Sequence, residues 1–244
     1  MELGTVTRIM RFPVKSMAGE EVDDVFISYS GVTGDRVYAF LDTTKTNNFP
    51  WMTARQKHDL VKYRTKFVQP SAPQQQYPRK EAFTIQVTTP EGHTYDVTDA
   101  SLRDALQEQT GVPLQLRFSE AGMQDSRPLS IVSTQTLAAL EQEMGMTVDH
   151  RRFRMNLEIN WKNEQPYYEN ELLGKTLRIG ETLTLQISKR DTRCVIITVD
   201  PDTGETTPEL LQHVAKEHKG SVGVYAVVLR EGVVKNGDRI VLEN

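Results

Sequence analysis

The chain has 244 residues, with 29 Lys and Arg against 33 Asp and Glu, so its formal net charge is −4. Hydrophobic residues make up 38% of it, which is the balance of a soluble globular chain and excludes disorder as the main state. A mildly acidic chain lacks the excess positive charge that a nucleic-acid backbone attracts, so we expect no nucleic-acid partner. The length allows one large domain or two small ones.

The chain contains a single cysteine, Cys194. One thiol cannot build an intrachain disulfide, a zinc ribbon, a ferredoxin-type iron–sulfur cluster or a CxxC redox pair. A chain without disulfides fits a reducing compartment. Its longest apolar stretches, such as residues 222–229, fall far short of the roughly 20 residues of a membrane helix, and residues 1–12 lack the apolar core of a secretory signal. We therefore expect a cytoplasmic protein with no membrane partner.

The first half of the sequence predicts short strands separated by turns. Runs rich in β-branched and aromatic residues predict strands at residues 3–12, 21–29, 36–42, 59–68, 83–89, 93–97 and 113–118. A helix is expected over residues 99–110, with Asp99 as its N-cap and Gly111 at its end. Residues 69–81, rich in Pro and Gln, have no apolar period and are expected to form a loop.

The second half adds two helices to the same pattern. Strands are predicted at residues 129–132, 153–159, 177–179, 182–188, 194–199, 222–229 and 239–242. One helix starts at Ser133 or Thr134, and another starts at Thr207-Pro208. Runs of strands with about three helices, without strict strand–helix alternation, predict a β-rich α+β fold rather than a doubly wound sheet. The polar stretch at residues 121–128 predicts a boundary between residues 1–120 and 121–244.

Two short segments in the second half carry candidate functional residues. Cys194 follows Arg193, and a neighbouring guanidinium favours the thiolate, which is both nucleophile and metal ligand. From spacing alone, however, a small buried apolar residue is the favoured interpretation of a free cysteine. Arg154 and Asn156 lie two apart in an expected strand and share one face with Arg152. That face suits an anion or a hydrogen-bonding heterocycle, and a solvated face with surface salt bridges is the alternative.

Other candidates lie at strand and helix ends. Lys15 and Ser16 follow the first strand, and Arg36 follows a turn, so these residues can place cations and a hydroxyl at the mouth of a site. Each of them alone is more commonly structural. The helix start at Ser133 and Thr134 can bind phosphate through free N–H groups, although Ser and Thr are also ordinary N-caps.

One group on the last helix has the spacing of a metal-binding pair. His213 and Glu217 are four residues apart, and Glu209 lies one turn earlier. This face can chelate a divalent ion, but a solvated helix face opposite Leu210 and Val214 is the favoured interpretation. We assign these residues no role.

Five segments, taken in order, resemble one known family. They are FPVKS at 12–16, GDRVYAFLD at 34–42, TARQ at 53–56, RFRMN at 152–156 and TRCVIITVDPDTG at 192–204. Over nearly its whole length the chain resembles the MOSC proteins with an N-terminal MOSC β-barrel, a group that includes the mitochondrial amidoxime-reducing component and its bacterial relatives. The resemblance implies an N-terminal MOSC β-barrel-like domain followed by a C-terminal MOSC β-barrel with peripheral helices.

The resemblance also implies a molybdenum cofactor, in which a molybdopterin dithiolene and one protein thiolate bind the metal. Cys194 falls at the thiolate position, as metal ligand and catalytic residue. The family's cofactor-binding positions correspond to Lys15, Ser16, Arg36, Arg154, Asn156, Thr192 and Arg193, with Ser133 and Thr134 in a segment that approaches the cofactor. Arg and Lys can bind its phosphate, and Arg, Asn and hydroxyl groups can bind the pterin edge. This agreement replaces the apolar interpretation of Cys194.

The implied function is a molybdenum-dependent oxidoreductase that reduces N-hydroxylated compounds such as amidoximes, hydroxylamines and N-hydroxylated bases. We expect a small-molecule substrate and no electron-transfer domain in this chain, and hence a separate electron-donor protein of the ferredoxin, flavoprotein or cytochrome type. The alternative is a non-enzymatic molybdenum-cofactor binding or sulfur-carrier protein that uses the same Cys194. A pyridoxal phosphate site with Lys15 as Schiff-base lysine ranks low, because the sequence near Lys15 offers no partner for a pyridine nitrogen.

Overall fold

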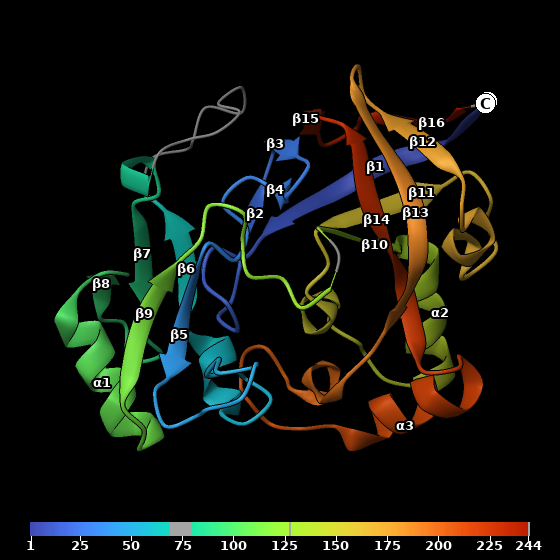
Figure 1. Ribbon diagram of the computed structural model, residues 1–244. Helices are drawn as coiled ribbons and strands as arrows, with labels where there is room; N and C mark the ends of the chain where they lie inside the picture. The colour runs from blue at the N-terminus through green and yellow to red at the C-terminus, as the bar shows by residue number, and fades with distance from the viewer. Residues whose placement is uncertain (69–79, 127, 244) are drawn as a thin grey trace.

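The computed structural model describes residues 1–68, 80–126 and 128–243. Its centre is a closed barrel of seven strands, which β1 (Glu2–Arg11) completes by pairing with β11 (Leu157–Trp161) on one side and β16 (Arg239–Glu243) on the other (Figure 1). From β11 the barrel continues through β10 (Leu129–Ser133), β14 (Ser221–Arg230), β13 (Leu183–Thr192) and β12 (Thr176–Ile179). The expected β-rich α+β class is confirmed.

Apolar side chains from alternate strand positions fill this barrel. On β13, Leu183, Leu185 and Ile187 are fully buried, while the residues between them are partly exposed. Successive side chains on a strand point to opposite faces, so this period of two gives each strand one apolar face toward the interior. The barrel is therefore a packed frame, and a ligand must bind where its strands end or outside it.

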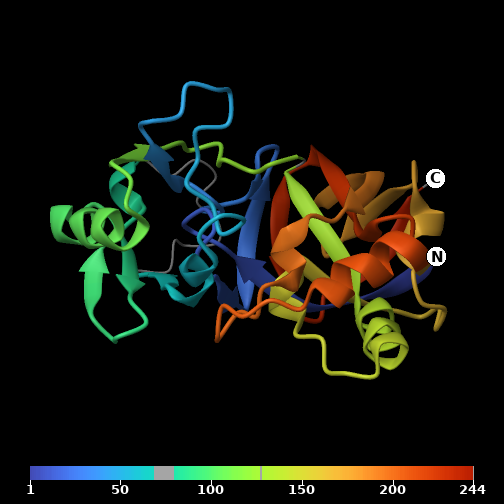
Figure 2. The same ribbon diagram turned by 90° about the horizontal axis from the view of Figure 1, so that it is seen from below.

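A smaller body of sheets lies beside the barrel (Figure 2). It contains the pair β5 (Tyr38–Asp42) and β9 (Leu114–Phe118). It also contains a three-stranded sheet of β6 (Arg64–Phe67), β7 (Ile85–Thr88) and β8 (Thr94–Asp96). Helix α1 (Ala100–Thr110) buries Leu102 and Leu106 in the same apolar cluster as these strands. The strands predicted at residues 83–89 and 93–97 are present as the antiparallel pair β7 and β8, and the predicted helix is present as α1.

The first strands of the chain lie with its last strands. β2 (Glu20–Val22) extends β1, and β3 (Asp24–Ser28) lies between β4 (Gly31–Val32) and β15 (Gly232–Lys235). The ends meet, since the Leu242 N–H donates to the Met1 carbonyl oxygen over 3.0 Å. In space, residues 2–32 therefore belong with strands that follow residue 129, and the boundary between residues 120 and 121 stays a prediction.

Helices α2 (Thr134–Met144) and α3 (Pro208–Glu217) share one apolar cluster outside the barrel, with Leu140 and Leu210 at its centre. Ser133 caps α2, because its hydroxyl accepts the Thr136 N–H over 3.1 Å. Pro208 opens α3. Both starts agree with the sequence prediction.

Three predicted strands begin as 3-10 helices instead. Leu60 and Val61 are adjacent and both buried, whereas neighbouring side chains on a strand point to opposite faces. Residues 58–62 instead form η1 (His58–Lys62), which precedes β6. Residues 150–153 form η3 (His150–Phe153), and Arg154 ends it in the left-handed conformation with φ 54°. The strand predicted for residues 153–159 therefore starts only at Leu157, and the shared strand face proposed for Arg152, Arg154 and Asn156 is wrong.

The strand predicted for residues 194–199 is also wrong, because η5 (Val195–Thr198) follows Cys194. Val195 is exposed, whereas Ile197 and Val199 are buried with Thr198 between them. This one-sided burial fits a helical turn rather than alternation.

Two further 3-10 helices are η2 (Lys80–Ala82) and η4 (Tyr168–Leu172). Residues 69–79 of the predicted loop lie outside the described residues. Within the described residues, no helix combines the length and apolar composition that crossing a membrane requires.

Candidate functional site

Cys194 lines a pocket of about 270 Å³ where β13 ends and the chain enters η5. We call it the Cys194 pocket. Six of its lining side chains are cationic and two are carboxylates, so the lining carries a positive excess. The pocket brings together eight residues that the sequence assigned to one site: Lys15, Ser16, Arg36, Arg154, Asn156, Thr192, Arg193 and Cys194.

Cys194 is half-buried and has no disulfide partner. Its backbone is extended, with φ −121° and ψ 179°, so it is the last extended residue before η5. The Arg193 N–H donates to the Gly220 carbonyl oxygen over 2.8 Å, which ties this segment to the start of β14. The thiol is thus held by a fixed backbone and remains accessible from the pocket.

Arg154 offers this pocket an unused hydrogen-bond donor. Its Nη1 donates to the Met17 carbonyl oxygen over 2.7 Å, and its guanidinium lies over the Phe12 ring, 4.4 Å from the centroid. Its Nη2 is buried with no partner among the described residues. Burial lowers the pKa of Arg154 to about 9, and the neighbouring Arg36 charge adds to this effect. An anion at Nη2 would compensate both the missing hydrogen bond and the desolvated charge.

Arg36 lies beside Arg154 and supports the same turn. Its Nη2 donates to the Arg154 carbonyl oxygen over 3.1 Å, and its Nη1 forms an ion pair with Asp35. Its guanidinium also lies over Phe12, at 4.8 Å. Like Arg154, it has φ 54°. The two arginines therefore reach one pocket from distant parts of the chain over one shared aromatic ring.

Lys15 is almost fully buried, with 7% of its surface exposed. Its Nζ donates to the Met123 carbonyl oxygen over 2.7 Å and forms an ion pair with Asp125. Burial lowers the pKa of Lys15, and Asp125 acts against that shift. Burial alone would raise the pKa of Asp125, but Lys15 and Arg55 outweigh it and lower this pKa overall. Ser16, next to Lys15, takes a left-handed backbone with φ 70°.

Arg193 joins the end of β13 to the turn that carries Arg154. Its Nη2 donates to the Phe153 carbonyl oxygen over 2.6 Å, and its Nη1 pairs with the buried Asp191. Its Nε is buried without a partner in the part of the chain that the structure describes. Burial raises the pKa of Asp191 and that of the adjacent Tyr225. Thr192 is exposed at the pocket mouth.

Asn156 lines the pocket, but its side chain mainly joins strands. Its Oδ1 accepts from the Ser130 hydroxyl over 3.0 Å, and its Nδ2 donates to the Met10 carbonyl oxygen over 3.3 Å. Only 2% of its surface is exposed. Asn156 thus fixes the joint of β1, β10 and β11 beside Arg154.

The structure does not bring Ser133 and Thr134 to this pocket. Ser133 is fully buried, caps α2 and donates to Glu169 Oε2 over 2.9 Å. Ser130, which does line the pocket, lies three residues earlier on β10, and three residues of strand span roughly 10 Å. The cofactor role of Ser133 and Thr134 stays a prediction, because neither residue lines the Cys194 pocket.

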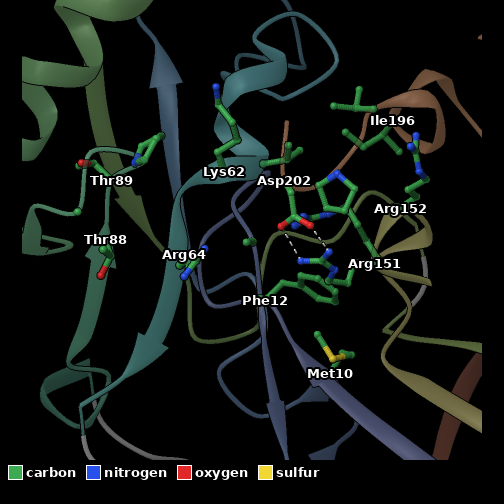
Figure 3. Close-up of a pocket in the computed structure, with 18 residues that line it drawn as sticks. Met10, Phe12, Lys62, Arg64, Thr88, Thr89, Arg151, Arg152, Ile196 and Asp202 are labelled. Carbon is green, nitrogen blue, oxygen red and sulfur yellow. Dashed lines mark hydrogen bonds and ion pairs between the residues drawn. The ribbon is translucent and has the colours of Figure 1, made fainter. Parts of the chain in front are cut away.

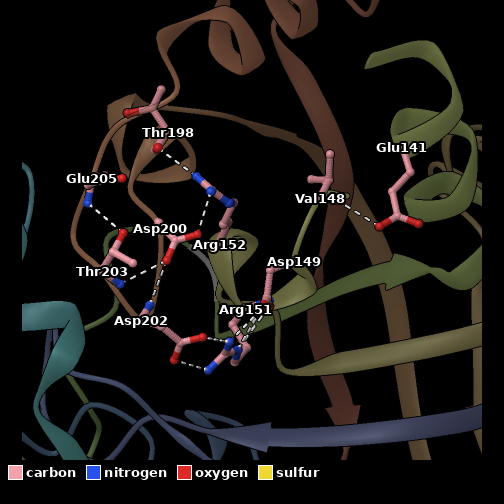
Figure 4. A network of polar contacts seen from close by, with 10 residues as sticks. All are labelled: Glu141, Val148, Asp149, Arg151, Arg152, Thr198, Asp200, Asp202, Thr203 and Glu205. Atoms are coloured by element: carbon pink, nitrogen blue, oxygen red, sulfur yellow. Dashed lines mark hydrogen bonds and ion pairs between the residues drawn. The ribbon is translucent and has the colours of Figure 1, made fainter. Parts of the chain in front are cut away.

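A polar network joins η3 to η5 and the residues that follow it (Figure 4). The buried Arg152 donates from Nη1 to the Thr198 carbonyl oxygen over 2.7 Å and from Nη2 to Asp200 over 2.8 Å. Its neighbour Arg151 is more exposed and pairs with Asp149 and Asp202. The network links η3 to the residues that follow η5, so it fixes the spacing of the two sides of the pocket.

A second pocket, of about 340 Å³, shares Arg154 and Ile196 with the first (Figure 3). Its cations include Arg151, which faces Asp202 in Figure 3 and pairs with it over 2.5 Å. Its lining includes no cysteine. This second pocket is larger than the Cys194 pocket, but without a cysteine it cannot supply a thiolate.

Sequence reasoning missed several residues of the Cys194 pocket. Asp125 and Ser126 lie in the polar stretch that was predicted only as a domain boundary. Asp191 is two residues before Arg193 on β13, a spacing that can signal a same-face ion pair. Tyr225 on β14 reaches the pocket through strand pairing with Lys189, which no local pattern reveals.

Two family models match the chain: the MOSC N-terminal beta barrel domain over residues 3–112, and the MOSC domain over residues 119–241. The chain belongs to the MOSC domain family. This family binds ligands related to the molybdenum cofactor, and its members include sulfurase-like proteins and oxidoreductases. The resemblance stated from the sequence is confirmed for both segments.

One solved structure shares this fold over nearly the whole chain. The YUAD protein of Bacillus subtilis is similar over 98% of this MOSC chain and 94% of its own, with 14% identity and a TM-score of 0.50. YiiM from Geobacillus stearothermophilus is 20% identical over 48% of this chain and 54% of its own, with a TM-score of 0.38. YiiM from Escherichia coli is 19% identical over 49% and 55%, with a TM-score of 0.36. No curated protein matches the chain.

Proposed function

We propose that this MOSC protein binds the molybdenum cofactor in the Cys194 pocket and reduces N-hydroxylated compounds. The observation that carries the proposal is the pairing of an accessible thiol with two buried guanidinium nitrogens, Arg154 Nη2 and Arg193 Nε, that have no partner among the described residues. A phosphate and a pterin rich in acceptors suit such donors. A thiolate suits a metal already bound by dithiolene sulfur. The residues present therefore fit the group.

Each residue has a distinct task in this proposal. The Cys194 thiolate would bind the metal, while Arg154, Arg36 and Lys15 would balance the negative charge of the phosphate and dithiolene. The Arg193 guanidinium, fixed by Asp191, would orient the pterin edge, with Thr192 offering a hydroxyl at the mouth. When bound, the cofactor supplies two-electron chemistry at an N–O bond.

The overall reaction consumes two electrons and two protons: R–NHOH becomes R–NH₂ and the oxygen leaves as water. The electrons would come from a separate protein of the ferredoxin, flavoprotein or cytochrome type. The positive excess of the lining favours an anionic cofactor over a cationic substrate.

The decisive experiment is elemental analysis of protein purified from a cofactor-producing host, joined to an amidoxime reduction assay with a chemical electron donor. We expect close to one molybdenum per chain and turnover in the wild type, and loss of both in Cys194→Ser. Thr53→Ser, a conservative change in the same lining, serves as the matched control. A Cys194→Ala protein that is loaded with molybdenum and active would refute the assignment.

A carrier function is the second candidate, because the family includes sulfurase-like members. The half-buried Cys194 would then hold cofactor or sulfur for transfer to another protein. Molybdenum loading without turnover of any N-hydroxylated compound, under donors that reduce the metal, would favour the carrier.

A further inference from the structure

Helices α2 and α3 lie close together (Figure 1) and bring three potential metal-ligand side chains within reach of one another, and these side chains line neither pocket. Glu143 stands in the last turn of α2, His213 lies in α3, and His218 is the C-cap of α3. Glu143 Oε2 lies 2.8 Å from His213 Nε2 and 2.6 Å from His218 Nε2. Three ligand atoms from two helices thus converge on one point.

The end of α3 creates this convergence. His218 leaves the helix with φ −119°, while its N–H still donates to the Val214 carbonyl oxygen over 3.1 Å. Its ring then meets the His213 ring edge-on, with centroids 5.6 Å apart. Glu217, the residue at the expected helical spacing from His213, instead pairs with Lys216. The ligand set therefore spans two helices, and helical spacing in the sequence does not reveal it.

Tyr167 orients the cluster from a third element. Its ring stacks on His218 at 4.2 Å, and its hydroxyl lies 3.2 Å from Glu143 Oε1. The same hydroxyl lies 2.9 Å from His218 Nε2, so Tyr167 contacts two of the three ligand groups. A donor on the distal oxygen of a metal-binding carboxylate is a common way to fix its orientation.

We propose that Glu143, His213 and His218 form a binding site for Zn²⁺ or a similar divalent transition metal. Two imidazoles and one carboxylate are a ligand set that zinc accepts, with the fourth position left to water. Bond lengths of about 2.0–2.2 Å place tetrahedral ligands roughly 3.3–3.5 Å apart, so Glu143 Oε2 needs to move away from each imidazole nitrogen by less than about 1 Å. All three ligand atoms lie within 4.8 Å of one another. The two histidines are half-buried and Glu143 is exposed, with 15–31% of each side chain accessible, so the site is open to the solvent yet held in place.

The site is distinct from the proposed molybdenum site and does not depend on it. A bound ion would link α2 to α3, and α3 packs through Leu210 and Val214 against Ile197 of η5. The expected result of metal binding is therefore a more stable junction of these elements.

The test is a Zn²⁺ titration of the full chain, stripped with a chelator, in competition with a chromophoric chelator. A Cys194→Ser background removes the thiol as a competing ligand. We expect one Zn²⁺ per chain, and at least about tenfold weaker binding in both His213→Gln and His218→Gln, because even the loss of an outer hydrogen-bond partner costs 10–100-fold. His93→Gln, at an exposed turn, is the matched control and should bind like the parent.

Co²⁺ gives a second readout, because tetrahedral coordination produces an intense visible band that hexaaqua Co²⁺ lacks. The band should appear in the parent and vanish in Glu143→Gln. Thermal unfolding with the chelator present shows whether each variant is folded, and the rise in melting temperature on adding Zn²⁺ should be confined to the parent and His93→Gln. Zinc affinity equal in the parent, His213→Gln and His218→Gln would overturn the proposal.

Discussion

The Nη2 of Arg36 donates to the backbone carbonyl oxygen of Arg154 over 3.1 Å, which joins two cations that are 118 residues apart in the chain. Both residues have φ 54°. Left-handed backbone is uncommon outside glycine, and it persists where surrounding contacts enforce it, often at binding sites. Here the contacts direct two guanidiniums into one pocket, and two adjacent positive charges are stabilised by an anion between or beside them.

The first prediction removes the Arg154 guanidinium. Arg154→Met keeps a long side chain over Phe12 but loses the donor at Nη2. Hydrogen bonds to charged groups contribute about 1.5–3 kcal/mol, so cofactor affinity should fall roughly 10- to 100-fold. The measurement is molybdenum and pterin content per folded chain after gel filtration. Arg117→Met, at an exposed position on β9, is the control, and equal cofactor loss in both variants would contradict the assignment.

The second prediction concerns the pH dependence of stability without cofactor. The folded pKa of Arg154, about 9, lies below its ordinary value, so above pH 9 the unfolded chain binds more protons at this residue than the folded chain. The destabilising effect of burying this charge is therefore complete below about pH 9 and is relieved as the pH rises through 9.

Urea unfolding of wild type and Arg154→Met from pH 7 to 10.5 measures this effect. The difference in free energy of unfolding should be constant up to about pH 8.5. It should then shift in favour of the wild type by at most about 1.4 kcal/mol per pH unit. A difference that stays flat to pH 10.5 would show that Arg154 keeps an ordinary pKa.

The third prediction compares the neighbours Arg151 and Arg152. Arg152 is 6% exposed and joins Thr198 and Asp200, so Arg152→Met should cost about 2–3 kcal/mol of stability. Arg151 forms more exposed ion pairs, which contribute about 0–1 kcal/mol, so Arg151→Met should be nearly neutral. Urea unfolding of both variants under one set of conditions decides the matter, and similar losses would mean that burial does not govern this network.

Much of the fold follows from local patterns. Asp99 and Gly111 mark the two ends of α1, and Ser133 and Pro208 mark the starts of α2 and α3. The alternation of buried residues on β13 marks the barrel interior. Helix caps, proline and strand period are all local properties of the sequence. The local structure around Cys194 was harder to predict from the sequence. Apolar side chains in Cys194–Val199 read as a strand, but tertiary packing of Ile197 and Val199 favours a 3-10 turn.

The site shows the same limit. Cys194, Lys15 and Arg36 were assigned through family resemblance, whereas the partners of Lys15 and Arg193 were not foreseen. Asp125 reaches Lys15 across 110 residues of chain, and no periodicity encodes such a contact. Closure of the barrel by β1, a tertiary event, brings the first segment of the chain to the last.

The last prediction tests whether Ser133 only caps α2 or also binds the cofactor. If Ser133 only caps α2 and supports Glu169, Ser133→Ala should cost about 1–2 kcal/mol of stability and leave molybdenum per folded chain unchanged. Urea unfolding and elemental analysis of the same preparation measure both quantities. Thr192→Ala, at the pocket mouth, should show the reverse: little change in stability and reduced cofactor content. Cofactor loss in a fully folded Ser133→Ala protein would instead mean that the start of α2 approaches the cofactor, as the family resemblance implies.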